Sequence, residues 1–219
     1  MYIVIVGAGR IGQRLAELAL NDGKENNNVI VIDKDQKRCE EVARKYDAIA
    51  INADATQEET LEESEVKKAD VLVTTIRDDA VNLMVVSLAR NKGVKSLVSL
   101  VNQEESIPMF MEKGVKIVKN PDLIIAENLY RAVKYPSIVD FMKVGEKASI
   151  FRIPLPPNSK ISGKTIKEIN LPKKSLIIAI ERGDRFIIPT EGVELQAGDK
   201  VTVIAHKDQV DKVAKLLSQ

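Results

Sequence analysis

The sequence predicts an α/β protein in which a Rossmann-like, doubly wound parallel sheet is followed by a small α+β domain. Three observations lead to this prediction. Short runs rich in Val and Ile alternate with amphipathic helical patterns over the first 120 residues, as in parallel sheets with right-handed crossovers. A glycine-rich turn, Gly7–Gly12, joins the first of these runs to the first helical pattern. After residue 148, strand-like runs follow one another, separated mainly by turn sequences.

Six strands and four helices are expected in the first part of the chain. The strands are expected at 2–6, 29–32, 48–51, 71–75, 96–101 and 115–118. The helices are expected at 10–22, 36–45, 78–91 and 105–113, with a short helical turn at 57–63. Six parallel strands are typical of the two-halved nucleotide fold, whose binding crevice lies at the carboxyl ends of strands one and four.

The pattern changes at Pro121, which suits the first position of a helix. One long helix is expected over 122–134, because its apolar residues recur at helical spacing and Pro136 should end it. An apolar-periodic stretch over 138–144 is interpreted as further helix. The chain is therefore divided into a first domain over 1–120, a long crossover helix and linker over 121–145, and a second domain over 146–219.

The second domain is expected to be mostly antiparallel. Its strand-like runs are Ser149–Ile153, Leu176–Glu181, Phe186–Ile188 and Val201–His206. The sequence Gly183-Asp184 predicts a hairpin loop between the second and third of them. A last amphipathic helix is expected to run to Leu217, with Asp208 as its N-cap.

Composition excludes several classes of protein. Lys and Arg number 33 and Asp and Glu number 32, so no global basic field favours nucleic acid as a partner. A single cysteine, Cys39, excludes an intramolecular disulfide and suits a reducing cytoplasm. No apolar stretch approaches the roughly 18–20 residues of a membrane-spanning helix. A strand beginning at Tyr2, without a basic lead, predicts no signal peptide. We therefore expect a soluble, cytoplasmic protein that does not insert into the membrane.

The first 33 residues carry a dinucleotide-binding fingerprint. Gly7 permits a tight turn, Gly9 lets the backbone approach a pyrophosphate, and Gly12 allows the helix to pack closely on the strand. The start of the helix offers unpaired N–H groups to phosphates. Asp33 ends the second strand about twenty residues further on, where a carboxylate can accept both ribose hydroxyls. The alternative is a glycine turn that only packs a βαβ unit.

Other polar residues follow strands at the same predicted crevice. Asp54 follows strand three, Thr74 and Thr75 end strand four, and Asp78 and Asn82 begin the next helix. Each has a turn or capping explanation, but their common location favours contact with a ligand.

Arg10 is a further candidate in the glycine loop. A cation at a helix start opposes the helix dipole unless it meets an anion, so a phosphate from its own nucleotide or from that of a neighbouring subunit would explain its position. The alternative is a solvated surface arginine.

No set of residues suggests catalysis. The only histidine, His206, ends a strand of the second domain, and the chain has no cluster of Cys and His. The one Tyr-x-x-x-Lys spacing, Tyr130 to Lys134, falls in the long helix expected over 122–134 and not beside the predicted crevice. We therefore predict a binding protein and not an enzyme. The alternatives are a small NAD-dependent oxidoreductase, which needs a proton donor, and a redox-sensing DNA-binding repressor, which needs a basic helix-turn-helix.

Taken together, these residues resemble the regulator of K⁺ conductance (RCK) family, the cytoplasmic proteins of Trk and Ktr potassium uptake systems. The resemblance covers essentially the whole chain. It rests on Gly7–Gly12, Asp33–Asp35, Asn52–Thr56, Ala69–Val73, Ala80–Met84, Asn120-Pro121, Ile188–Thr190 and Leu195–Asp199.

The resemblance implies a regulatory subunit. RCK proteins form homodimers through the crossover helix and assemble into rings, commonly octamers, beneath a separate potassium-transporting membrane subunit. They are thus peripheral to the inner face of the membrane. NAD(H) or ATP/ADP in the RCK-N domain, here 1–120, changes the ring and gates the pore. The RCK-C domain, here 146–219, can bind a second effector, and some rings carry a cation.

Carried onto this chain, the resemblance assigns phosphates to the glycine loop, the ribose to Asp33 and the adenine end to Asp54 and Thr56. The complete set of predicted nucleotide-binding residues is Gly7, Gly9, Arg10, Ile11, Gly12, Asp33, Lys34, Asp54, Ala55, Thr56, Thr74, Thr75 and Asp78. Many relatives carry an arginine where this chain has Leu100, which should weaken binding or change the preferred nucleotide. NAD(H) and ATP/ADP both stay open, whereas Asp33 disfavours the 2′-phosphate of NADP(H).

Overall fold

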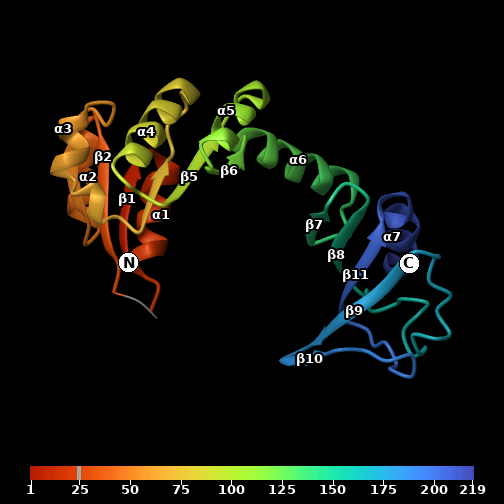
Figure 1. The fold of residues 1–219 in the computed structure, drawn as a ribbon. Helices are drawn as coiled ribbons and strands as arrows, with labels where there is room; N and C mark the ends of the chain where they lie inside the picture. Colours follow the sequence, from red (N-terminus) through yellow and green to blue (C-terminus); the bar gives the residue numbers. More distant parts are fainter. Residues whose placement is uncertain (24–25) are drawn as a thin grey trace. The chain divides into compact units, whose positions relative to one another are not determined.

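The structure is a computed structural model that describes residues 1–23 and 26–219. It divides into two compact units, Met1–Ile124 and Ile125–Gln219, which are described separately (Figure 1). Among the described residues, no helix combines the length and the apolar character that crossing a lipid bilayer requires.

The first unit is a six-stranded parallel sheet in the order β3-β2-β1-β4-β5-β6. Its strands are β1 (Tyr2–Val6), β2 (Asn28–Asp33), β3 (Ile49–Asn52), β4 (Val71–Thr74), β5 (Ser96–Val101) and β6 (Lys116–Lys119). Its helices are α1 (Arg10–Leu20), α2 (Gln36–Lys45), α3 (Glu58–Glu63), α4 (Asp79–Asn91) and α5 (Ile107–Glu112), with 3₁₀ turns at Val66–Lys68 and Glu104–Ser106. The predicted doubly wound parallel sheet is confirmed.

Alternation along the central strand explains the two helical layers of this unit. Ile3 and Ile5 of β1 belong to the core that α1 and α2 cover. Val4 and Val6 belong to the core that contains residues of α3, α4 and α5. Because successive side chains of a strand point to opposite faces, a continuous run of β-branched residues buries both faces at once.

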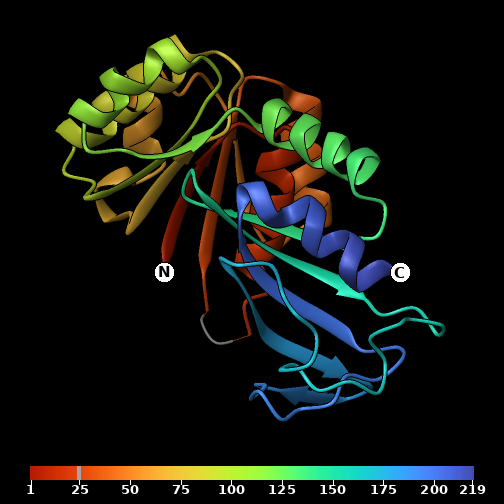
Figure 2. The ribbon, with the colours of Figure 1, turned by 90° about the vertical axis from the view of Figure 1, so that its right-hand side faces the viewer.

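The second unit is a five-stranded antiparallel sheet in the order β10-β9-β11-β8-β7, with one helix packed against it (Figure 2). Its elements are β7 (Asp140–Val144), β8 (Ala148–Pro154), β9 (Ser175–Arg182), β10 (Arg185–Ile187), β11 (Lys200–His206) and α7 (Val210–Ser218). Val213 and Leu217 of α7 are fully buried in the same core as Phe151 and Val203 of the sheet. The predicted small antiparallel α+β domain is confirmed.

Two local predictions in this unit are wrong. The stretch 138–144, interpreted as helix, contains strand β7, which pairs with β8 so that Phe141 lies opposite Phe151. Gly145, at φ +59°, allows the tight turn between the two strands. Asp208 does not cap the last helix, because a 3₁₀ turn over Lys207–Gln209 precedes α7.

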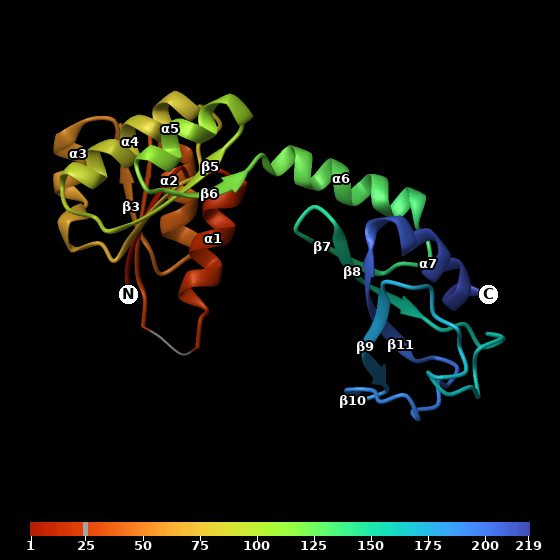
Figure 3. The ribbon, with the colours of Figure 1, turned by 45° about the vertical axis from the view of Figure 1, so that its right-hand side comes forward.

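Helix α6 (Pro121–Lys134) carries the chain from the first unit to the second (Figure 3). It begins at Pro121 and ends two residues before Pro136, as the sequence predicts. Asn120 caps it, since its side-chain oxygen accepts a hydrogen bond from the Leu123 N–H at 3.1 Å. No residue of α6 is buried.

Candidate functional site

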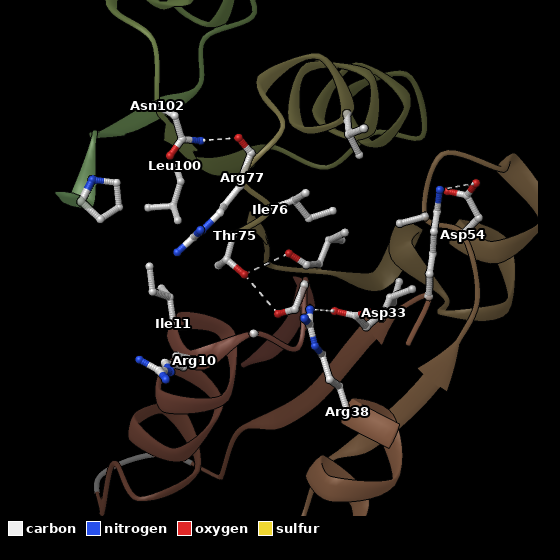
Figure 4. A pocket seen from close by; sticks show the side chains of 18 of the residues that line it. Arg10, Ile11, Asp33, Arg38, Asp54, Thr75, Ile76, Arg77, Leu100 and Asn102 are labelled. Carbon is white, nitrogen blue, oxygen red and sulfur yellow. Dashed lines mark hydrogen bonds and ion pairs between the residues drawn. The ribbon is translucent and has the colours of Figure 1, made fainter. Parts of the chain in front are cut away.

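A cavity of about 780 Å³ opens at the carboxyl ends of the central strands of the first unit (Figure 4). This volume is in the range of small-molecule and cofactor sites. Nine of the residues predicted from sequence line it: Gly7, Gly9, Arg10, Ile11, Asp33, Lys34, Asp54, Ala55 and Thr75. Gly12, Thr56, Thr74 and Asp78 are not among the lining residues.

The glycine loop between β1 and α1 forms one wall of the cavity. Gly7 has φ +106°, and a Cβ there would lie 2.6 Å from the Thr75 hydroxyl oxygen. A Cβ on Gly12 would lie 1.8 Å from the Gly7 carbonyl oxygen, so this glycine lets α1 pack against the loop from behind. A Cβ on Gly9 would meet nothing within 4 Å. Gly9 thus leaves open space on the side of the cavity.

The start of α1 is suited to an anion. Gly9 provides no side-chain cap, and the first turn contains no acidic residue. The first N–H groups of a helix have no acceptor within the helix, and they carry the positive end of its dipole. Since Gly9, Arg10 and Ile11 all line the cavity, a negatively charged ligand can meet these groups there.

Asp33 at the end of β2 is held by the backbone on both sides. One oxygen accepts a hydrogen bond from the Ala8 N–H at 2.6 Å, and the other accepts one from the Asp35 N–H at 2.8 Å. Arg38 approaches the first oxygen to 3.8 Å. Each carboxylate oxygen can accept more than one hydrogen bond, so the oriented carboxylate can still receive two hydroxyls.

Asp54 follows β3 and is locked in its ionised form. Its Oδ1 accepts hydrogen bonds from the Thr56 N–H at 2.9 Å and the Thr56 hydroxyl at 2.7 Å, and Lys34 lies 2.9 Å from Oδ2. Burial alone would raise the pKa of Asp54, but these hydrogen bonds and the Lys34 charge outweigh it and lower the pKa to about 2. Thr56 therefore acts by holding Asp54 in place.

The two threonines at the end of β4 point in different directions. The Thr75 hydroxyl lies 3.2 Å from the Val6 carbonyl oxygen and 3.1 Å from the Gly7 carbonyl oxygen. Thr75 lines the cavity. The Thr74 hydroxyl is buried and shares a hydrogen bond of 2.7 Å with Ser99. Thr74 therefore braces β4 against β5.

The polar residues at the start of α4 have structural roles in the structure. Asp78 caps the helix by accepting hydrogen bonds from the Ala80 and Val81 N–H groups, at 2.9 and 3.2 Å. Asn82 is fully buried and donates to the carbonyl oxygens of Ile76, at 2.7 Å, and Leu100, at 3.2 Å. Neither lines the cavity.

Several lining residues were not predicted from sequence, among them Arg38, Ile76, Arg77, Val81, Asn102 and Asp122. The one feature of the sequence that could have identified them is their position relative to the strands. Asn102 directly follows the end of β5, and Arg77 lies three residues after the end of β4, where residues of a doubly wound sheet reach the crevice. Leu100 lines the cavity with a nearly buried apolar side chain.

Comparison with known families accounts for both units of the chain. The TrkA-N domain family matches residues 3–121, and the TrkA-C domain family matches residues 150–218. The chain is 30% identical over 216 residues to a Trk system potassium uptake protein TrkA homolog from Methanothermobacter thermautotrophicus, covering 98% of both proteins.

Solved structures show the same fold. The RCK domain of GsuK is 27% identical with a TM-score of 0.52, over 99% of this chain and 46% of that one. The GsuK channel bound to NAD is 26% identical with a TM-score of 0.54, over 99% of this chain and 38% of the channel.

Proposed function

This chain belongs to the TrkA-N domain family, and from that premise we propose that it is a regulatory subunit that binds an adenine nucleotide and controls a separate potassium-transporting membrane protein. The observation that carries the proposal is the convergence on one cavity of the glycine loop, the uncapped start of α1 and the Asp33 carboxylate. The relative named for Trk potassium uptake supports a role in potassium uptake, and the NAD-bound GsuK channel supports an adenine nucleotide as the ligand.

In this proposal the ligand is NAD(H) or ATP/ADP. The phosphates lie at Gly9 and the start of α1, where the backbone is open and the helix dipole is positive. Asp33 accepts the ribose hydroxyls, and the segment around Asp54 lies at the adenine end. A 2′-phosphate would meet the Asp33 carboxylate, which disfavours NADP(H).

The protein acts by binding and not by catalysis in this proposal. The charged and polar side chains that line the cavity are those of Arg, Lys, Asp, Asn and Thr. They can hold phosphates and hydroxyls through charge and hydrogen bonds. A hydride transfer would also need a placed proton donor beside the nicotinamide, commonly His, a Tyr–Lys pair or Lys. Of these types the described lining residues include Lys34, which forms an ion pair with Asp54 at 2.9 Å.

The proposed working form is a homo-oligomer. Helix α6 exposes large apolar side chains, which are normally covered by a partner surface. We propose a homodimer that assembles into a ring, commonly an octamer in the family, held in the cytoplasm at the inner face of the membrane by the transporter. Nucleotides that bind two ring shapes unequally would shift their populations by about 1–3 kcal/mol per coupled site.

The decisive experiment measures potassium flux into vesicles that contain a Trk- or Ktr-type membrane subunit, with and without this protein and with ATP, ADP, NAD or NADH. We expect the protein to make the flux depend on which nucleotide is present. Arg10→Ala should reduce the difference between nucleotides, because it removes a cation at the start of α1, while the exposed Arg44→Ala serves as a matched control. A flux indifferent to the protein and to every nucleotide would refute the proposal.

A further inference from the structure

The cavity of the first unit contains more positive charge than its own carboxylates engage. Four cationic side chains line it: Arg10, Lys34, Arg38 and Arg77. Lys34 forms an ion pair with Asp54 at 2.9 Å, and Arg38 lies 3.8 Å from Asp33 and 3.5 Å from Asp35. These two cations therefore form ion pairs with carboxylates of the protein.

Arg10 and Arg77 differ from the other two cations. Within the part of the chain that the structure describes, no carboxylate lies within ion-pair distance of either guanidinium. The lining carboxylate that is not engaged by Lys34 or Arg38 is Asp122, at the start of α6. Two guanidiniums that face one cavity and have no carboxylate within ion-pair distance can each form a charged hydrogen-bonded pair with an anionic group of a ligand.

The two arginines reach the cavity from different elements. Arg10 is the first residue of α1, whereas Arg77 lies in the loop between β4 and α4. Figure 4 shows the Arg77 side chain extending from this loop in the direction of Ile11 at the start of α1. A ligand seated at the glycine loop is thus within the space that both arginines line.

The backbone that carries Arg77 is anchored. Its carbonyl oxygen accepts a hydrogen bond of 3.0 Å from the side-chain amide of Asn102. That amide also donates to Asp79 at 2.9 Å, and Asp79 in turn accepts from the Asn102 N–H at 2.9 Å. Asp79 is 9% exposed, so a nearly buried carboxylate fixes the position from which Arg77 reaches. This preorganisation lowers the entropic cost of contacting a ligand.

We propose that Arg77 is a second phosphate-contacting residue and that, together with Arg10, it makes the site select ligands with two linked phosphates over those with one or none. The inference rests on the proposed nucleotide-binding function and adds a specificity determinant to it. Each guanidinium can form a bidentate pair with a phosphate. A monophosphate satisfies one of them and leaves the other unpaired, whereas the diphosphate group shared by ADP, ATP and NAD(H) satisfies both.

The test is calorimetric titration of adenosine, AMP, ADP, ATP and NAD into the wild-type protein, Arg77→Ala, Arg77→Lys and the control Arg44→Ala. We expect Arg77→Ala to weaken binding of the three diphosphate-containing ligands about ten- to a hundredfold and to leave adenosine unchanged, since a hydrogen bond to a charged group is lost. Arg77→Lys should restore part of the loss, because it keeps the charge but not the fork geometry. Arg44→Ala should bind as the wild type does.

The outcomes separate this inference from the proposed function. An equal loss of affinity for adenosine and ADP in Arg77→Ala would mean that the residue only shapes the loop, and unchanged ADP affinity would mean that it does not contact phosphate. Either result overturns the role of Arg77 while nucleotide binding stands. Failure of the wild-type protein to bind any of the five ligands would overturn the proposed function and this inference with it.

Discussion

At the scale of single residues, the cavity is held in shape by carboxylates that accept backbone hydrogen bonds. Asp33 receives the Ala8 N–H, Asp54 receives that of Thr56, and Asp79 receives that of Asn102. Burial alone would raise the pKa of Asp79, but hydrogen bonds from Asn102 and Gln103 outweigh it and lower the pKa. Asp33 and Asp79 thus anchor the loops that follow β1 and β5, whereas Asp54 anchors its own loop after β3.

Asp54 makes this arrangement testable by pH. Its pKa is 3.8 ordinarily and about 2 in the fold, so its contribution to stability is complete above about pH 4 and is lost as the pH falls towards 2. The shift corresponds to no more than about 2 kcal/mol. In urea unfolding measured across this range, we expect the wild type to exceed Asp54→Asn in stability above pH 4 and the difference to shrink on acidification. The exposed Asp47→Asn is the control, and a difference that does not change with pH would contradict the assignment.

The sequence predicts which residues lie near the crevice, but it does not always predict which way their side chains point. Thr74 and Thr75 are adjacent at a strand end, and only Thr75 lines the cavity, because alternate side chains of a strand point to opposite sides. Sequence alone could place both at the crevice and could not choose between them. Asp78 was recognisable as an N-cap as well as a ligand contact, and in the structure it caps α4.

At the scale of elements, Gly9 and Gly12 at the β1–α1 junction have two different roles. A Cβ on Gly12 would collide with the backbone at 1.8 Å, whereas one on Gly9 would enter open space, and Gly9 has the extended backbone (φ −70°) that alanine also adopts. Gly12 is therefore required by the packing of α1 on the loop. In the proposed function, Gly9 is required by the approach of a ligand.

We accordingly expect opposite behaviour from two alanine variants. Gly9→Ala should unfold within about 0.5 kcal/mol of the wild type but lose nucleotide affinity, because its methyl group occupies the space of a phosphate. Gly12→Ala should lose several kcal/mol of stability, as overpacked sites do. Urea unfolding and calorimetry on both variants check this. If Gly9→Ala binds nucleotide as tightly as the wild type, the phosphate does not lie at this loop.

Element boundaries were predictable where hydrophobic periodicity was strong. Strands β1 to β6 lie within one or two residues of their expected positions, because each is a short β-branched run between helical patterns. The prediction of helix is wrong for the stretch that forms β7, since a short apolar run does not distinguish helix from strand by itself. Its structure is decided by pairing with β8, a contact that no local pattern of residues 138–144 reveals.

At the scale of the whole molecule, α6 is the element that neither unit explains by itself. Several of its apolar side chains are strongly exposed: Leu129 by 65%, Tyr130 by 67% and Val133 by 80%. Isolated helices of about this length are marginal in water, and most helices in proteins are stabilised by burying an apolar face. A fourteen-residue helix in which no residue is buried therefore needs a further surface to cover it.

We expect that surface to be a second copy of this chain, so the purified protein should not be a monomer at micromolar concentration. The double variant Leu129→Glu/Val133→Lys should dissociate it, because charges replace two exposed apolar anchors. The new pair has the Glu-to-Lys i,i+4 spacing that supports a helix, so loss of assembly cannot be attributed to loss of α6. Light scattering gives the mass and circular dichroism the helix content, with Leu18→Glu, an exposed apolar position on α1, as the control. A wild-type protein that scatters as a monomer, with and without nucleotide, would show that α6 is not covered by another copy.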